Sequence, residues 1–251
     1  MVIEVKNLSF GYGEKKVLKD INLYIPSGKF VAILGRNGSG KSTLLKLMAG
    51  MFDLEKGWIY INGHDLKSLK RTQIARLIGY LPQFHTSFFP FTVEEVVLTG
   101  RASFVFSVPN RHDREIVEKV MKIVGIEEIR GRRYTELSGG ERQLVMFTRV
   151  LAQEPKIVLM DEPLSHLDLH NQVKILNLIK ELTAKGLTVV AVLHDPNTAF
   201  RFADEFIFLK NGSIFRIDSD KKLWDQSVLS EVYDAPLEVI PYKGRALVMP
   251  I

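Results

Sequence analysis

The residues most suited to chemistry lie between positions 35 and 42, where the chain reads GRNGSGKS. Glycines at this spacing let backbone amides surround phosphate oxygens, a lysine can reach terminal phosphates, and the next hydroxyl can ligate magnesium. An apolar run precedes the loop and helically spaced leucines follow it, which is the strand–loop–helix order of a mononucleotide fold. We therefore predict a phosphate loop in which Lys41 and Ser42 supply the main side-chain contacts. A glycine-rich turn that only caps a helix is the alternative interpretation.

Two carboxylates end a second apolar run, IVLMDE at residues 157–162. A carboxylate at the end of a strand beside a phosphate loop is where such enzymes hold magnesium, so Asp161 takes that role. Glu162 would be a costly second charge unless it had a function, and a glutamate there can polarise an attacking water as a general base. The alternative is that both residues only open the turn at Pro163.

One histidine stands at the end of the next apolar run, residues 188–193. His194 follows the strand that comes after the carboxylate strand, which places it towards the terminal phosphate. A structural histidine is the alternative.

A second candidate anion site is LSGGERQ at residues 137–143. Ser138 and Glu141 have the spacing of a capping box, which opens a helix. Gly139 and Gly140 disfavour helix and indicate a close approach of the backbone to another group. Amides at a helix N-terminus bind anions, so the chain has two potential phosphate contacts that lie far apart in sequence.

The elements around these motifs follow from hydrophobic spacing. Strands are predicted at residues 2–5, 17–25, 30–34, 58–61, 157–160 and 188–193, with a hairpin at 206–217 around Asn211-Gly212. Helices are predicted at 41–49, over much of 92–152, where Gly125 is placed to end one, and at 171–184. Strands that alternate with helices predict a parallel sheet. After residue 217 the pattern is less regular.

The composition of the 251 residues is that of a globular chain, with 46% hydrophobic and 25% charged residues. The net charge of +5 is spread over the sequence and supports nucleic acid or anionic lipid only weakly as partners. The absence of cysteine excludes disulfides and thiolate metal sites. No apolar run approaches the length of a membrane span and no signal layout opens the chain, so we expect a cytoplasmic protein.

The order of GRNGSGKS, Gln83 in LPQ, LSGGERQ, IVLMDE, SHLD at 165–168 and His194 resembles the ATP-binding cassette (ABC) family, from Tyr12 to about Ile217. The resemblance implies one ABC ATPase domain of α/β class, a P-loop NTPase with a RecA-like core. Residues 1–86 and 157–217 would form that core with an antiparallel β subdomain, residues 87–156 an inserted α-helical signature subdomain, and residues 218–251 a C-terminal tail.

The resemblance also implies ATP and Mg²⁺ as cofactors and assigns roles to single residues. Glu162 and His194 would be catalytic. Tyr12 would stack on adenine, although a core or turn aromatic is its alternative. Gln83 would join Ser42 and Asp161 around magnesium and sense a membrane partner, and Asp168 would communicate between sites. The implied nucleotide contacts are Tyr12, Gly35, Arg36, Asn37, Gly38, Ser39, Gly40, Lys41, Ser42, Thr43, Gln83, Ser138, Gly139, Gly140, Glu141 and Asp168.

In this family the signature helix faces ATP held by a second subunit. One phosphate loop and one signature per chain therefore imply two chains. We expect a homodimer, and a pair with a different second cassette is the alternative. The further partners implied are transmembrane permease subunits and, indirectly, an extracytoplasmic substrate-binding protein, with no nucleic acid. The chain would lie on the cytoplasmic face of the membrane through the permease.

Three segments resemble the importers of iron-siderophore complexes, haem and cobalamin: RTQIARLIGYLPQ (71–83), VEEVVLTGR (93–101) and HDPN (194–197). Pro196 and Leu164 depart from the usual pattern. The alternatives are a molybdate or tungstate importer, an exporter, and a soluble ABC ATPase without a transport role. Soluble cassettes of DNA maintenance usually contain a long coiled coil, and those of translation carry two cassettes in one chain. This sequence has neither feature, which favours an importer.

Phenylalanines are dense after the glutamine loop, at Phe88, Phe89, Phe91, Phe104 and Phe106. Aromatic residues on loops at this density indicate an exposed apolar patch for a partner. We hypothesise that they line the groove that receives a cytoplasmic helix of the permease. Packing inside the helical subdomain is the alternative.

Overall fold

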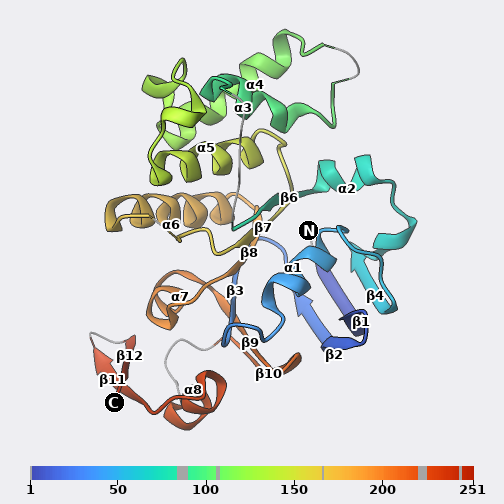
Figure 1. Cartoon of the computed structure of the whole chain (residues 1–251), viewed down its shortest axis with the longest axis vertical. Coiled ribbons are helices and arrows are strands. Elements are labelled where there is room, and N and C mark those ends of the chain that lie inside the picture. The colour runs from blue at the N-terminus through green and yellow to red at the C-terminus, as the bar shows by residue number, and fades with distance from the viewer. Residues whose placement is uncertain (1, 84–89, 106–107, 166, 220–224, 243–244) are drawn as a thin grey trace.

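A computed structural model of the chain describes residues 2–83, 90–105, 108–165, 167–219, 225–242 and 245–251. Within these residues the strands form three sheets of six, four and two strands. Figure 1 shows the four-stranded sheet beside the central strands and the helices of residues 93–151 gathered at one end. None of the described helices is both long and apolar enough to cross a membrane.

The six-stranded sheet has the order β10-β9-β3-β8-β7-β6. Its neighbours are parallel except that β10 returns antiparallel to β9. Every residue of β3, β7 and β8 is buried, as expected for parallel strands covered on both faces, and the predicted parallel sheet is confirmed. The strands are β3 Phe30–Leu34, β6 Ile78–Leu81, β7 Ile157–Asp161, β8 Thr188–Val192, β9 Glu205–Lys210 and β10 Ser213–Asp218.

The four-stranded sheet is the expected antiparallel β subdomain. Its strands, in the order β2-β1-β4-β5, are β1 Ile3–Tyr12, β2 Lys15–Ile25, β4 Lys56–Ile61 and β5 His64–Asp65. Buried residues of β2 such as Ile21 share one apolar cluster with Ile33 of β3 and Leu44 of the first helix. This shared core fixes the β subdomain against the phosphate loop, which lies between β3 and that helix.

Helices cover both faces of the six-stranded sheet (Figure 1). The first, α1, packs in the cluster shared with the β subdomain, whereas Ile175 of α6 and Ala199 of α7 belong to the cluster on the other face. The helices of this part are α1 Lys41–Met48, η1 Leu66–Ser68, α2 Arg71–Leu77, α6 Leu169–Ala184 and α7 Pro196–Phe202.

The inserted helical lobe lies at the upper end of Figure 1. It comprises α3 Val93–Leu98, η2 Thr99–Arg101, α4 Arg111–Val124, η3 Glu127–Ile129, η4 Tyr134–Glu136 and α5 Gly139–Leu151. Gly125 ends α4 in the left-handed conformation, with φ of 68°, as its position in the sequence predicts.

One buried guanidinium joins the segments of this lobe. Arg101 is only 3% exposed, and its Nε donates to Asp113 Oδ1 at 3.1 Å. Another nitrogen of Arg101 donates to the carbonyl oxygen of Ala152 at 2.9 Å and to Glu154 at 3.1 Å. A single side chain therefore ties η2 to the start of α4 and to the end of α5.

We expect Arg101→Leu to lower the free energy of unfolding by about 3–5 kcal/mol, because Asp113 would stay buried without its cation. Urea unfolding followed by circular dichroism measures this change. Arg111→Leu is the control, since its side chain is 93% exposed and its pair with Glu115 lies on the surface, where ion pairs contribute little. Equal losses in the two variants would contradict a special role for the buried pair.

The C-terminal tail, whose sequence pattern is less regular, contains more regular structure than that pattern predicts. It contains α8 Gln226–Tyr233 and a hairpin of β11 Leu237–Tyr242 with β12 Arg245–Pro250. The side chain of Asn197 in α7 bonds both backbone groups of Val248, at 3.0 and 2.7 Å. The hairpin is thus held by contacts with a helix about 50 residues earlier, which no local pattern reveals.

Candidate functional site

The loop between β3 and α1 needs glycine for steric reasons. Gly35 has φ of 142°, and a Cβ there would lie 2.1 Å from the carbonyl oxygen of Leu209. Gly40 has φ of 106°, and its Cβ would lie 2.6 Å from Leu18. Ser39 carries a buried hydroxyl for which no partner is found within the described residues. A phosphate oxygen fits this cradle, because it would accept from backbone amides and from that hydroxyl.

Lys41 is folded over the loop and is almost fully buried. Its Nζ donates to the carbonyl oxygens of Gly35 and Arg36, both at 2.8 Å. Burial lowers the pKa of Lys41, although the nearby carboxylates of Glu162 and Asp161 oppose that change. A desolvated ammonium held by two neutral carbonyl oxygens is well placed to exchange them for phosphate.

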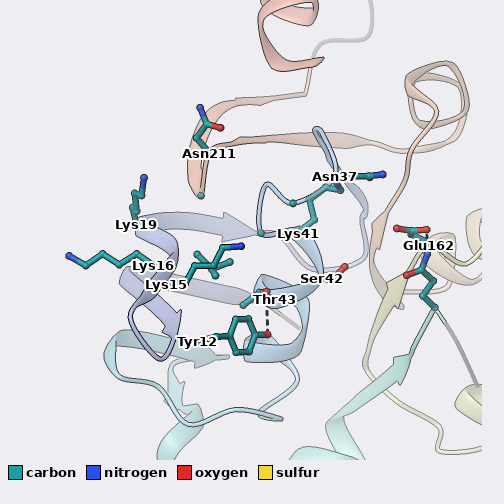
Figure 2. A pocket seen from close by; sticks show the side chains of 15 residues that line it. Tyr12, Lys15, Lys16, Lys19, Asn37, Lys41, Ser42, Thr43, Glu162 and Asn211 are labelled. Carbon is teal, nitrogen blue, oxygen red and sulfur yellow. Dashed lines mark hydrogen bonds between the residues drawn. The ribbon is translucent and has the colours of Figure 1, made fainter. Parts of the chain in front are cut away.

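A cavity of about 820 Å³ opens beside the loop. Figure 2 shows Tyr12 and Glu162 on opposite sides of it, with Ser42 between them. The sequence analysis missed some of the residues that line this cavity, because β2 and the β9–β10 turn come next to the phosphate loop only in the folded chain. The missed residues are Lys15, Lys16, Val17, Lys19, Asn211 and Gly212.

Tyr12 lies at the edge of the cavity and is not a core aromatic. It is 48% exposed, and its ring meets Phe10 and Phe52 edge-on, at centroid distances of 5.2 and 5.7 Å. Its hydroxyl lies 3.4 Å from Thr43 Oγ1. The ring is thereby held in place with surface left towards the cavity, an arrangement suited to stacking a planar base.

Ser42 and Asp161 meet at the end of β7. Ser42 Oγ donates to Asp161 Oδ1 at 2.8 Å, and burial raises the pKa of the Asp161 carboxyl. These are hard oxygen donors, and Mg²⁺ is commonly held by one or two protein oxygens together with substrate phosphates. Within the described residues no cluster of three or more His, Cys, Asp or Glu could hold a metal by itself. The donor set therefore fits magnesium that arrives with a nucleotide.

Glu162 has a strained backbone and several partners. Its φ is 52°, an uncommon value for a residue with a side chain, and such strain concentrates at functional sites. Glu162 Oε1 lies 2.6 Å from His194 Nε2, and Oε2 accepts hydrogen bonds from Ser165 Oγ at 3.2 Å and from the Gln83 amide. The structure thus brings together the predicted base, the histidine and the glutamine.

Among the described residues, Gln83 makes no hydrogen bond to Ser42 or Asp161. Its side-chain amide donates to Glu162, because a carboxylate oxygen is a stronger acceptor than a neutral one. Its predicted share in magnesium binding stays a prediction. Glu162 and Gln83 line the same cavity as the phosphate loop.

The second candidate anion site has the local structure that the sequence predicts. Ser138 caps α5 by accepting from the Glu141 amide at 3.2 Å, and Glu141 accepts from the Ser138 amide at 2.8 Å. A Cβ on Gly139 would have no neighbour within 4 Å, whereas one on Gly140 would lie 3.3 Å from the Asn171 side chain. The chain's own packing therefore does not require glycine at position 139.

Residues 138–141 do not line the cavity beside the phosphate loop. Within one chain the two candidate phosphate contacts thus do not share this cavity. Asp168 is not on that cavity either, and it caps α6 by accepting from the Asn171 amide at 2.8 Å. Its predicted role between two sites stays a prediction.

Comparisons with known proteins agree on one family. A family model described as ABC transporter matches residues 18–165. The ferric enterobactin transport ATP-binding protein of Escherichia coli is 36% identical over 251 residues, covering 98% of this chain and 93% of that protein. A solved ABC transporter assigned to the metal-chelate type, in an inward-facing conformation, matches with a TM-score of 0.86 and 30% identity, over 100% of this chain and 97% of that one. A bacterial ABC transporter cassette solved as a dimer matches with a TM-score of 0.76 and 33% identity, over 86% and 98% of the two chains.

Proposed function

The chain belongs to the ABC transporter family, as the ATP-hydrolysing subunit of an importer, and on that premise we propose that its cargo is a metal chelate such as an iron-siderophore complex, haem or cobalamin. The observation that supports this cargo most is the 36% identity to a ferric enterobactin transport ATP-binding protein over nearly the full length of both chains. We further propose the domain limits stated above, with the core at 1–86 and 157–217, the signature subdomain at 87–156 and the tail at 218–251.

The geometry suggests how each residue contributes to hydrolysis. Lys41, Ser39 and the loop amides would bind the phosphates, while Ser42 and Asp161 would hold magnesium, which neutralises phosphate charge when bound. Glu162 would accept a proton from the water that attacks the terminal phosphorus, as ADP leaves. The contacts of His194 and Gln83 to Glu162 would orient its carboxylate.

ABC ATPases work as paired cassettes joined to permease subunits. We propose that two copies of this chain pair, with residues 138–141 of each completing the phosphate site of the other. The separation of the two anion sites within one chain supports this arrangement. The pair would lie at the cytoplasmic face of the membrane through the permease, which would receive cargo from an extracytoplasmic binding protein.

A groove of about 530 Å³ is our candidate for the permease contact. It lies between α2, β6 and α5, and Met51, Ile74 and Ala75 supply apolar surface to it. Arg149 also lines it, and burial lowers the pKa of this guanidinium, whose Nε donates to the neutral hydroxyl of Thr99 at 2.8 Å. An apolar groove with a desolvated cation suits a short amphipathic segment that carries a carboxylate.

The phenylalanine hypothesis stays a prediction, and only two of its five residues are described. Phe91 and Phe104 are 45% and 37% exposed, but neither lines the groove. Phe104 packs beside the guanidinium groups of Arg76 and Arg101, at 4.9 and 4.1 Å from its ring centroid. Phe88, Phe89 and Phe106 lie outside the described residues.

Uptake by cells tests both the cargo and the groove. We expect that deleting the gene in its native cell abolishes uptake of an iron-labelled siderophore, labelled haem or cobalamin, and that the intact gene restores it. Met51→Glu should fail to restore uptake, because a charge would enter an apolar contact, while the ATPase rate of the isolated chain stays normal. Tyr24→Glu is the matched control, since Tyr24 and Met51 are both 56% exposed and Tyr24 lies outside the groove.

Loss of molybdate or tungstate uptake in the deletion strain would instead support the related importer branch. Normal uptake of every one of these cargos would favour a non-transport ATPase. Restoration of uptake by Met51→Glu would contradict the groove as the permease contact.

A further inference from the structure

Tyr80 connects the groove to the magnesium carboxylate. It lies on β6, which pairs with β7 in parallel so that Tyr80 faces Leu159, two residues before Asp161. Its side chain lines the groove, and its hydroxyl lies 3.5 Å from Asp161 Oδ2. One side chain thus touches both a surface that is open to a partner and a residue of the phosphate site.

The two oxygens of Asp161 have different partners. Oδ1 accepts a hydrogen bond from Ser42 at 2.8 Å. Within the described residues, the Tyr80 hydroxyl is the only hydrogen-bond partner of Oδ2. A phenol is protonated at neutral pH and can therefore donate a hydrogen bond to this oxygen. A donor on Oδ2 restrains rotation of the carboxylate and keeps Oδ1 directed at Ser42.

We propose that Tyr80 is a positioning residue that transmits occupation of the groove to Asp161. An occupant that contacts Met51, Ile74 and Ala75 would also contact the Tyr80 ring, because all four residues line the same groove. A shift of that ring moves the hydroxyl relative to Oδ2 and so changes how tightly the carboxylate can hold a divalent cation. The inference rests on the proposed role of Asp161 as a magnesium ligand.

The first test measures metal binding without turnover. Mn²⁺, which takes the same oxygen ligands, is titrated into the full chain with a non-hydrolysable ATP analogue, and free Mn²⁺ is followed by electron paramagnetic resonance. Tyr80→Phe should raise the Mn²⁺ dissociation constant about threefold to tenfold, as expected for the loss of one hydrogen bond to a carboxylate. Binding of the analogue without metal should not change.

Tyr233→Phe is the matched control for this titration. The Tyr233 hydroxyl is also buried, and no partner for it is found within the described residues, so its removal should leave Mn²⁺ binding unchanged. Equal Mn²⁺ affinity in Tyr80→Phe and the unmodified chain would overturn the assignment of Tyr80.

The second test fills the groove. Because the chain has no cysteine, Ala75→Cys creates a single thiol that can carry a bulky fluorescein maleimide. The label should raise the Mn²⁺ dissociation constant towards the Tyr80→Phe value and have no further effect in the Ala75→Cys, Tyr80→Phe double variant. A label with no effect in either background, or with an equal effect in both, would overturn the transmission through Tyr80.

Failure of the underlying function gives a different result. If the unmodified chain bound Mn²⁺ no better with the ATP analogue than without it, Asp161 would not be the ligand and the proposed magnesium site would fail. Normal Mn²⁺ binding with an unchanged Tyr80→Phe variant would remove only the role of Tyr80.

Discussion

Glu162→Gln should lower ATP turnover by about 10²–10⁴-fold, the range expected when a general base is removed. The amide has nearly the same shape as the carboxylate but cannot accept the proton of the attacking water. Its oxygen can still accept hydrogen bonds from Gln83 and Ser165, so the site should keep its shape and continue to bind ATP. Phosphate release measures the loss of turnover.

The same variant should accumulate an ATP-bound pair of chains, because the nucleotides would join the two cassettes without being hydrolysed. Light scattering with and without ATP detects that pair. Glu231→Gln is the control, since Glu231 is an exposed residue that pairs with Lys210 away from the cavity. Turnover at the normal rate in Glu162→Gln would show that another group is the base.

Gly139→Asp should lower turnover by about 100-fold or more without affecting the fold of the single chain. A Cβ at Gly139 meets no neighbour within 4 Å. An acidic side chain in the first turn of a helix also interacts favourably with the positive end of the helix dipole. Against a phosphate held by a partner chain, the same carboxylate would repel the ligand and cover the amides. Thermal unfolding and phosphate release separate these two effects.

Gly131→Asp is the matched control, because a Cβ at Gly131 also has no neighbour within 4 Å and position 131 lies outside the signature. Its turnover should stay normal. Normal turnover in Gly139→Asp would contradict the assignment of the signature to the phosphate site.

Mixing two inactive variants tests whether that site is shared. Lys41→Ala disables the phosphate loop and Gly139→Asp disables the signature, so a mixed pair keeps one site built from an intact loop and an intact signature. We expect part of the ATP turnover to return on mixing. If both contacts acted within one chain, the mixture would stay as inactive as its components.

Much of the fold could be predicted because it depends on short-range patterns. The run of residues 30–34 is buried on both faces and forms β3 as predicted, and Gly125 ends α4 because few other residues adopt its left-handed conformation. The tail could not be predicted in this way. Its hairpin is held by Asn197, and the hydrogen bonds of a distant helix leave no periodic signal in residues 237–250.

The candidate site likewise contains local features that could be predicted and long-range contacts that could not. The phosphate loop and the capping box of α5 are local structures whose conformation follows from residue type and spacing, so the sequence by itself determined them. Other features of the site join segments that are far apart in the chain. Four lysines line one cavity, Gln83 contacts Glu162, and Tyr80 extends from the groove to Asp161. Only the tertiary structure decided these contacts, because the distance between two side chains on different strands depends on strand order and register and not on sequence spacing.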